Sequence, residues 1–249
     1  HLLAFNEPDN CNDQSGQYGN MCVVDTSLVY YKNLLKSGLR MVSPATRQGE
    51  VFSWLNEFNY KAENQEIRID VIAVHWYDWT SNPENSPNAN PQDIYNRFVN
   101  YLENVYNLYG LPIWITEFNA NRYRNEWVHR QFLQLALPYL EETEYIERYS
   151  FFPPVTDQAD FFDENNNYTQ IGEFYSNFNS TKSIAENEYA SPSNLNSNDY
   201  EFTQTECNPN NAFLSNHEIE SQKEITIYPN PSSDYIFIEF DQEITDLKI

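Results

Sequence analysis

The chain has 249 residues, a formal net charge of −23 and an aromatic content of 16%. So acidic a protein is repelled by nucleic-acid phosphates and by anionic lipid, which excludes both as expected partners. Hydrophobic residues make up 40% of the chain, enough for a folded core, and no apolar run approaches the roughly 20 residues of a membrane span. Because an apolar segment follows His1 directly and an alternating pattern runs to Ile249, we expect this chain to be an internal piece of a longer protein.

Short apolar runs recur along the first 178 residues, and each has the length and composition of a buried strand. They cover residues 2–6, 39–43, 69–75, 112–117 and 146–152. Segments of helical periodicity separate them. Asp25 predicts the start of one helix, which ends at Gly38, and Asn90 opens a second, which ends before Gly110. Asn125 opens a third helix.

This strand–helix repeat of about 30–40 residues is typical of a parallel α/β fold. A doubly wound sheet and a (β/α)8 barrel both fit the repeat. A complete barrel needs about 250 residues, whereas the five units occupy about 178 residues. If the fold is a barrel, three units are therefore missing before the first strand.

The composition changes after residue 180. Residues 181–222 are rich in Asn, Ser and Glu without a sustained period, which indicates a linker. In residues 223–249 a Pro-Asn-Pro turn at 229–231 separates two apolar segments, and the second of them, 235–240, is predicted to be a strand. We therefore divide the chain into a domain at 1–180, a linker at 181–222 and the start of a β domain at 223–249.

Glutamates follow two of the predicted strands, Glu7 after the first and Glu117 after the fourth. Ligand sites of parallel α/β folds lie at these strand ends. Across a small closed barrel, two such carboxyls can come within about 5–6 Å, the separation that a retaining glycosidase needs for its proton donor and its nucleophile. A single glutamate after a strand is more often an acid at a helix N-terminus than a catalyst. Only the combination favours catalysis.

Aromatic residues follow the third strand and support a sugar ligand. Trp76, Tyr77 and Trp79 lie outside any helical core period, and His75 precedes them. Aromatic rings stack on the apolar faces of sugars, while Asn, His and Asp bind hydroxyl groups. A core position is the alternative for either tryptophan, and both cannot be in the core if the chain turns there.

Five ordered motifs resemble the catalytic core of glycoside hydrolase family 128, β-1,3-glucanases of clan A. These motifs are Leu3–Asp9, Leu39–Ala45, Trp54–Leu55, Val74–Tyr77 and Ile113–Phe118. The resemblance covers residues 1 to about 178 and implies a (β/α)8 barrel of which strands 4 to 8 are present. It implies that Glu7 is the acid/base, Glu117 the nucleophile and Asn6 the ligand of the sugar 2-hydroxyl. His75 and Tyr77 would orient the nucleophile or the sugar.

One position departs from clan A, whose members often carry a tryptophan near the end of strand 8. Here Phe152 occupies that region; it can stack on a sugar but has no indole N–H to donate. The segment from Ile227 to Ile238 resembles the opening of a type IX secretion sorting domain, a β-sandwich. That resemblance implies a secreted or cell-surface protein handled by secretion machinery. Cys11 and Cys22 could then form a disulfide.

The sequence thus predicts a retaining glycoside hydrolase that cleaves β-1,3-glucan, with no cofactor and no metal. The catalytic candidates are Glu7 and Glu117. The substrate-binding candidates are Asn6, His75, Trp76, Tyr77, Trp79 and Phe152. Two alternatives remain open: another clan A glycosidase, such as a β-1,4-glucanase or a mannanase, or a carbohydrate-binding barrel without catalytic activity.

Overall fold

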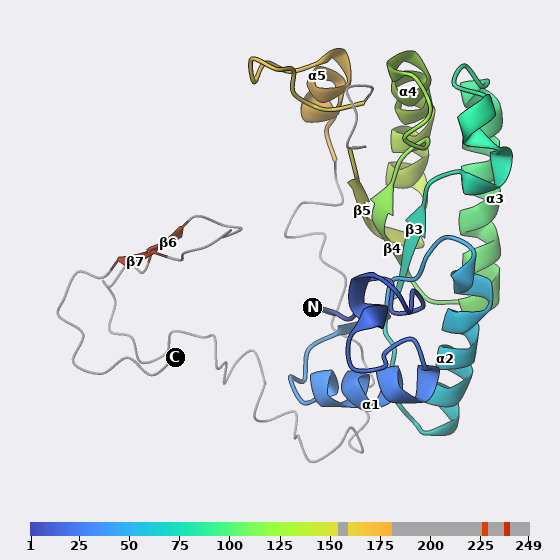
Figure 1. Cartoon of the computed structure of the whole chain (residues 1–249), viewed down its shortest axis with the longest axis vertical. Helices are drawn as coiled ribbons and strands as arrows, with labels where there is room; N and C mark the ends of the chain where they lie inside the picture. Colours follow the sequence, from blue (N-terminus) through green and yellow to red (C-terminus); the bar gives the residue numbers. More distant parts are fainter. Residues whose placement is uncertain (154–158, 181–225, 229–236, 240–249) are drawn as a thin grey trace. The chain divides into compact units, whose positions relative to one another are not determined.

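The computed structural model describes residues 1–153, 159–180, 226–228 and 237–239 (Figure 1). The chain forms two compact units, His1–Thr203 and Gln204–Ile249. In the second unit, strands β6 (Thr226–Tyr228) and β7 (Phe237–Glu239) pair in antiparallel fashion. This pair confirms a strand within the predicted segment 235–240, whereas the predicted linker at 181–222 lies outside the described residues.

Within its described residues, 1–153 and 159–180, the first unit contains five parallel strands. They are β1 (Leu2–Leu3), β2 (Met41–Val42), β3 (Ile72–Trp76), β4 (Ile113–Phe118) and β5 (Ile146–Phe151). β1 pairs with β2, and β4 lies between β3 and β5. A parallel bridge between Val42 and Val71 joins the two groups, so the strands follow one another in space as they do in the sequence. The described strands therefore lack the reversal of order that defines a doubly wound sheet.

Helices connect the strands as the repeat predicts. They are α1 (Val24–Leu35), α2 (Trp54–Asn64), α3 (Pro91–Tyr109), α4 (Glu126–Glu142) and α5 (Gln170–Asn177). Short 3₁₀ turns are η1 (Gln14–Gln17), η2 (Glu50–Phe52), η3 (Trp79–Ser81) and η4 (Pro83–Asn85). Figure 1 shows α3 and α4 running alongside β3, β4 and β5.

Two of the predicted helix starts are confirmed and one is wrong. The side chains of Asn90 and Asn125 each accept a backbone N–H in the first turn of their helices. α1 instead begins at Val24, after Val23 and without a side-chain cap. Asp25 lies in the first turn, where a carboxylate is stabilised by the helix dipole and, here, pairs with a lysine of α2.

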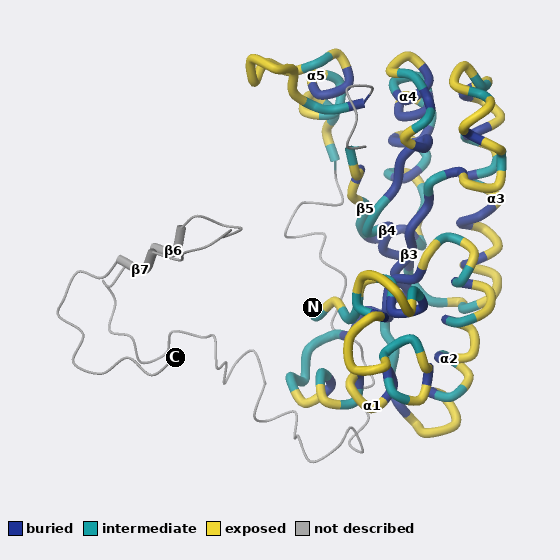
Figure 2. The backbone as a smooth tube through the Cα atoms, viewed as in Figure 1, coloured by how far each residue is buried: buried dark blue, intermediate teal, exposed yellow. Residues whose placement is uncertain are grey.

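Strands β3 and β4 are buried along most of their length (Figure 2), but the two faces of the sheet have different surroundings. Trp76, Ile115 and Phe118 point to the side covered by the helices and belong to the main core. Val42, Ala73 and Trp114 form a smaller apolar cluster on the other face, with residues from strands and strand ends only. Because successive strand residues alternate between faces, His75 lies opposite Trp76 and shares the face that the helices leave uncovered.

No helix in residues 1–153 and 159–180 combines the length and the apolar composition needed to cross a bilayer.

Candidate active site

Glu7 occupies a tight turn beyond β1, next to the parallel bridge between Asn6 and Ala45. Its φ of +42° lies in the left-handed region, which is costly for a residue with a β-carbon and recurs at functional sites. The backbone N–H of Glu7 donates to the carbonyl of Ala45 at 2.7 Å, which anchors this turn to the end of β2. Two residues on, Asp9 is buried against Arg47, with Nε 2.6 Å from Oδ2. The turn that presents Glu7 is thus fixed on both sides.

A disulfide and a close contact hold the rest of this loop. Cys11 and Cys22 form the disulfide that the sequence raised as a possibility. Gly16 packs so closely against the carbonyls of Pro8 and Asn10 that a β-carbon there would come within 2.4 Å of both oxygens. Because even alanine would clash with backbone, this position requires glycine.

A bulge in β4 sets the direction of Glu117. Val74 of β3 pairs with Ile115, but the next residue, His75, pairs with Glu117 rather than with Thr116. The extra residue, Thr116, shifts the alternation along β4 by one position. Glu117 therefore points to the same face as His75, and Phe118 returns to the core.

Glu7, from the turn after β1, converges on this face with His75 of β3 and Glu117 of β4. His75 Nδ1 lies 3.1 Å from Oε1 of Glu7 and 3.5 Å from Oε2 of Glu117. One side-chain atom from each of the three residues lies within 4.8 Å of the other two. The imidazole is 1% exposed, whereas the glutamates are 18% and 22% exposed, so the carboxylates remain open to a ligand.

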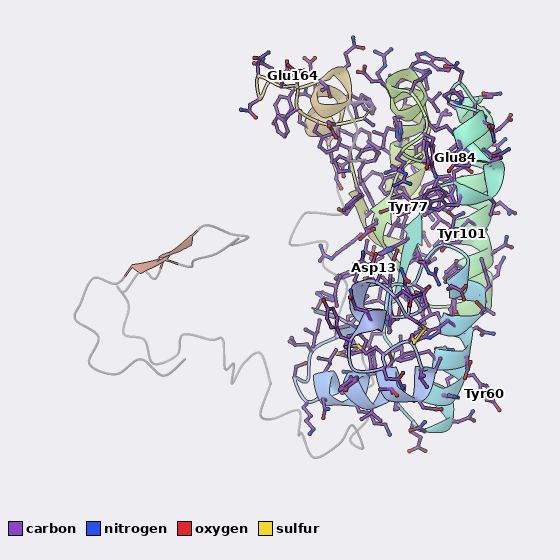
Figure 3. All side chains as sticks on the ribbon, in the orientation of Figure 1. Asp13, Tyr60, Tyr77, Glu84, Tyr101 and Glu164 are labelled. Atoms are coloured by element: carbon purple, nitrogen blue, oxygen red, sulfur yellow. A yellow bond between two sulfur atoms is a disulfide. The ribbon has the colours of Figure 1, made fainter. Side chains whose placement is uncertain are left out.

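Tyr77 is hydrogen-bonded to the second glutamate. Its hydroxyl donates to Oε2 of Glu117, and it lies at the ends of the central strands (Figure 3). Burial raises the pKa of Tyr77 far above its usual value, and the neighbouring carboxylates of Glu117 and Glu7 raise it further. The phenol is therefore neutral at every physiological pH and acts as a permanent donor to Glu117.

The structure separates the two tryptophans. Trp76 is 1% exposed and packs between Phe98 and Phe132, with ring centroids 4.8 and 5.6 Å away. Its assignment as a substrate-binding residue is therefore wrong, because its ring faces the helices and not the side of the glutamates. Trp79 is 47% exposed and remains the candidate for sugar stacking.

The remaining candidates line the same side of the strands. Asn6 is exposed next to Glu7, and its amide donates to the side chain of Gln14 at 3.0 Å. Phe152 follows β5, is 45% exposed and meets Tyr77 edge to face with centroids 6.4 Å apart. The rings of Phe152 and Tyr77 thus border the carboxylates on the β5 side.

Several residues around Trp79 were not among the candidates predicted from the sequence. Arg122 lies 5.7 Å from the ring of Trp79 and 5.0 Å from that of Tyr123, so these three residues form an aromatic and cationic cluster. Behind Trp79, the fully buried Asp78 pairs with Arg97 at 2.7 Å and with buried Arg124 at 3.1 Å. In the sequence, the only sign of this cluster is that a cation and an aromatic residue, Arg122 and Tyr123, stand next to each other after the fourth predicted strand.

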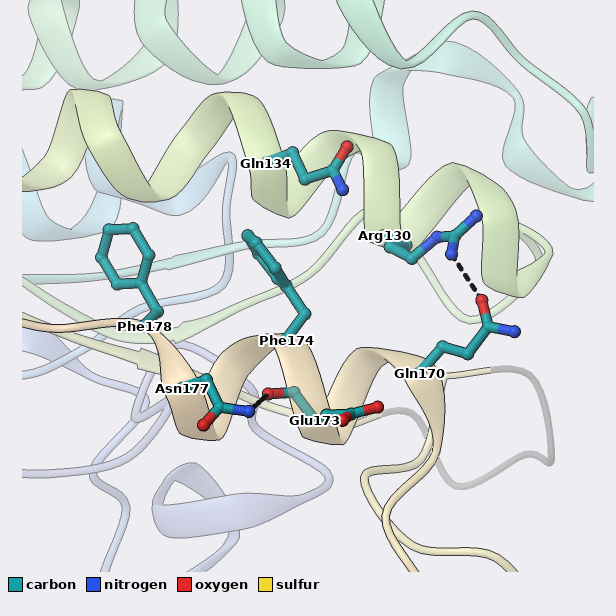
Figure 4. A pocket seen from close by; sticks show the side chains of 7 residues that line it. All are labelled: Arg130, Gln134, Gln170, Glu173, Phe174, Asn177 and Phe178. Carbon is teal, nitrogen blue, oxygen red and sulfur yellow. Dashed lines mark hydrogen bonds between the residues drawn. The ribbon is translucent and has the colours of Figure 1, made fainter.

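A separate cavity lies on the outer side of the fold, between α4 and α5 (Figure 4). It has a volume of about 620 Å³ and contains the rings of Phe174 and Phe178. Three of its polar side chains are already hydrogen-bonded, since Arg130 donates to the side chain of Gln170 and Asn177 donates to the backbone carbonyl of Glu173. None of the sequence-predicted site residues lines this cavity.

Within the described residues, one group has the spacing of metal ligands, and it consists of Glu7, His75 and Glu117. Two carboxylates and an imidazole would suit a transition metal. The same atoms, however, already hydrogen-bond with one another and with Tyr77. The arrangement is also that of a carboxylate pair for acid/base and nucleophilic chemistry.

Comparisons with known proteins agree with this geometry. Residues 1–175 match the sequence model of the family described as "Glycosyl hydrolase catalytic core". Alkali-sensitive linkage protein 1 of Schizosaccharomyces pombe is 30% identical over 193 residues, 70% of this chain. The chain spans only 32% of the length of that relative.

Solved structures with the same fold include two endo-β-1,3-glucanases. One, a family 128 subgroup I enzyme from Amycolatopsis mediterranei in complex with laminaritriose, is 26% identical, covers 70% of each chain and has a TM-score of 0.56. The other, a subgroup II enzyme from Sorangium cellulosum, has a TM-score of 0.57 over 72% of this chain and 70% of its own, but at 21% identity it supports the fold alone. With more than half of its residues matched by the family model, this chain belongs to the glycosyl hydrolase catalytic core family.

Proposed function

We propose that the protein is a retaining glycoside hydrolase that cleaves β-1,3-glucan, with Glu7 as the acid/base and Glu117 as the nucleophile. The observation that carries the proposal is the approach of the two carboxylates, whose oxygens lie within 4.8 Å of each other. Retaining glycosidases hold their carboxyls about 5–5.5 Å apart, whereas inverting enzymes need about 6.5–9.5 Å to admit a water molecule. The separation therefore supports double displacement.

The reaction has two steps. Glu7 protonates the leaving glycosidic oxygen while Glu117 attacks the anomeric carbon, so the C–O bond to the leaving sugar breaks and a glycosyl–Glu117 ester forms. Glu7, now ionised, then takes a proton from water, whose oxygen attacks the same carbon and releases Glu117. Two inversions at one carbon leave the product with the configuration of the substrate.

The contacts of Glu117 suggest which oxygen attacks. Within the described residues, the contacts of its carboxylate to Tyr77 and His75 both fall on Oε2. Oε1 is then the oxygen that faces the anomeric carbon. The hydroxyl of Tyr77 holds the carboxylate plane in place without neutralising its charge, because the phenol keeps its own proton.

We also propose that the five parallel strands are strands 4 to 8 of a (β/α)8 barrel. The sequential strand order and the single helix-covered face support this assignment. A bidentate ion pair joins Arg40, beside β2, to Glu147 of β5 at 2.5 and 2.6 Å, over the two intervening strands. Such a contact is expected where a sheet curves around a common interior.

The proposed function and its alternatives differ in the polysaccharide that the protein should hydrolyse or bind. The similarity to a family 128 glucanase bound to laminaritriose favours β-1,3-glucan. Release of reducing sugar should be measured with laminarin, carboxymethylcellulose and mannan on the full-length protein. Laminarin should be the preferred substrate. Preference for either of the others would point to a different clan A activity, and binding of laminarin without turnover would point to a carbohydrate-binding protein.

We further propose that the protein works outside the cytoplasm, through export directed by its C-terminal segment. The disulfide between Cys11 and Cys22 supports an oxidising compartment. The identity of the segment as a type IX sorting domain rests on the resemblance at residues 227–238 alone. Secretion of a reporter fused to that segment in a type IX-competent bacterium, and its retention when the segment is deleted, would test the assignment.

A further inference from the structure

Tyr77 is held by amide side chains from two other strand ends. Oε1 of Gln48, which follows β2, accepts the backbone N–H of Tyr77 at 3.0 Å and that of Trp79 at 3.3 Å. Nδ2 of Asn121, which follows β4, donates to the backbone carbonyl of Tyr77 at 2.6 Å. Both polar groups of the Tyr77 backbone are therefore bound by side chains, and the residue cannot move along the strand axis without breaking one of these bonds.

Asn121 is in a strained conformation that its contacts maintain. Its φ is +84°, and its side chain is fully buried. Its own N–H donates to Oδ1 of Asn119 at 2.7 Å, and its carbonyl contacts Nε2 of His129 at 2.9 Å. Backbone strain at a buried residue persists only where the surroundings determine it, and it is most often found beside functional sites.

The same network reaches the fourth strand end. Nδ2 of Asn119 donates to the carbonyl of Phe152 at 2.7 Å, and the ring of Phe152 contacts that of Tyr77. The side-chain amides of Gln48, Asn119 and Asn121 thus connect the segments that follow β2, β3, β4 and β5 around Tyr77. The hydroxyl of Tyr77 is hydrogen-bonded to Glu117.

We propose that Gln48 and Asn121 are positioning residues that act through Tyr77 on Glu117. This inference rests on the proposed function, in which Glu117 is the nucleophile. Neither residue has to touch substrate. Each fixes the backbone of Tyr77, so that the hydroxyl meets Oε2 of Glu117 and leaves Oε1 directed at the anomeric carbon. A displacement of the order of 1 Å at such a position can cost about 100-fold in rate.

The two residues should differ in their effect on substrate binding. Gln48 also holds the backbone of Trp79, whose exposed ring is the candidate for sugar stacking. Loss of the Gln48 amide should therefore lower kcat and raise KM. The amide nitrogen of Asn121 holds Tyr77, and its Oδ1 accepts the backbone N–H of Tyr123 rather than that of Trp79, so its loss should lower kcat with a smaller rise in KM than the loss of Gln48 causes.

A double-mutant cycle on laminarin hydrolysis by the full-length protein tests the proposal. Gln48→Met removes the acceptor at similar length, and Gln48→Glu keeps an oxygen for the two N–H groups. Gln48→Met should lower kcat about tenfold, and Gln48→Glu should restore most of that loss. In a Tyr77→Phe background, Gln48→Met should cause no further fall in kcat, because the hydroxyl through which it acts is already gone.

Asn121→Gly is the second variant of the experiment, because glycine adopts a positive φ readily but lacks the side-chain amide that binds Tyr77. It should lower kcat and, like Gln48→Met, have no effect on kcat when Tyr77 is Phe. Asn166→Gly is the matched control, because Asn166 also has a positive φ but is exposed and distant in sequence from the site; it should leave kcat unchanged.

The outcomes separate this inference from the proposed function. If the unmodified protein does not hydrolyse any glucan, the proposed function fails. If it does, but the losses from Gln48→Met and Tyr77→Phe multiply, Gln48 does not act through Tyr77 and the inference is overturned. A fall in thermal midpoint with unchanged kcat in both variants would likewise overturn it, because it would assign the amides a structural role only.

Discussion

The buried imidazole of His75 lies 3.1 Å from the carboxylate of Glu7, which ties the middle of the sheet to the turn after β1. The same nitrogen is 3.5 Å from Glu117. A single N–H at this position can donate to Glu7 or to Glu117 but not fully to both, so the two carboxylates share one hydrogen-bond donor.

Replacement of Glu117 by alanine should abolish turnover of laminarin, and added azide or formate should restore part of it. The deleted side chain leaves room for a small anion on the face from which the carboxylate attacks. The product of azide rescue should be a glycosyl azide of inverted configuration, identified by NMR. If neither anion restores turnover, Glu117 is not the nucleophile.

Glu7→Gln should spare substrates with good leaving groups and cripple hydrolysis of the polysaccharide. A dinitrophenolate departs without a proton, whereas a sugar alkoxide needs one from the acid. The measurement compares kcat/KM for dinitrophenyl glycosides and laminarin in the two proteins. Equal losses on both substrates would assign Glu7 a structural role.

The two tryptophans should respond in opposite ways to alanine. Trp79→Ala removes an exposed ring two residues after Tyr77 and should raise KM for laminarin oligosaccharides about tenfold, equivalent to about 1.4 kcal/mol, with little change in stability. Trp76→Ala opens a cavity between α3, α4 and the sheet, and should lower the free energy of unfolding by about 3–5 kcal/mol. Calorimetric titration in a Glu7→Gln background and urea denaturation provide the two readouts. Unchanged oligosaccharide affinity in Trp79→Ala would remove that ring from the binding site.

The contrast between Trp76 and Trp79 shows where the sequence is informative. The apolar runs predicted the five parallel strands described in the first unit, because a short run of apolar residues between loops is typical of a buried strand. Helix α2 was not predicted, although Leu55, Phe58 and Ala62 have helical spacing. Its N-terminus has no side-chain cap, so the sequence gives no clear start signal there. Which tryptophan faces the helices depends on strand alternation and on where β3 ends, and a shift of one residue exchanges the faces.

The site was predictable only in part for a similar reason. Glu7 and Glu117 stand out as acids at strand ends, and the resemblance to a known family supplied their roles. Gln48 and Asn121 have no comparable signal, because amides are common in loops and their partner, Tyr77, lies in another loop. The bulge at Thr116, which directs Glu117 toward His75, also follows from pairing geometry that the local sequence does not reveal.

Removal of metal ions should not affect hydrolysis. Although Glu7, His75 and Glu117 have metal-ligand spacing, the proposed reaction uses the carboxylates directly. Activity on laminarin should be the same before and after dialysis against EDTA. Loss of activity on dialysis, restored by a divalent ion, would mean that these three residues hold a metal instead.

Stability should fall in acid because of a buried histidine behind the site. Burial lowers the pKa of His129 to about 4, against 6.5 in the unfolded chain. Between these values the unfolded state binds more protons, so stability is complete above pH 6.5 and decreases as the pH falls toward 4, by roughly 3 kcal/mol in all. Urea denaturation across this range should show a smaller pH dependence for His129→Gln than for the unmodified protein. An identical dependence would mean that His129 is not the titrating group.

The central claim is that Glu117 forms a covalent bond to the sugar while Glu7 does not. The most direct measurement is mass spectrometry of the full-length protein after reaction with a dinitrophenyl 2-deoxy-2-fluoro-laminaribioside, which slows release of the glycosyl–enzyme. The account predicts a mass increase of one fluorinated disaccharide, located by peptide mapping on Glu117 and absent from the Glu117→Ala variant. A label on Glu7 or another residue, or a protein that hydrolyses laminarin with inversion and takes up no label, would contradict it.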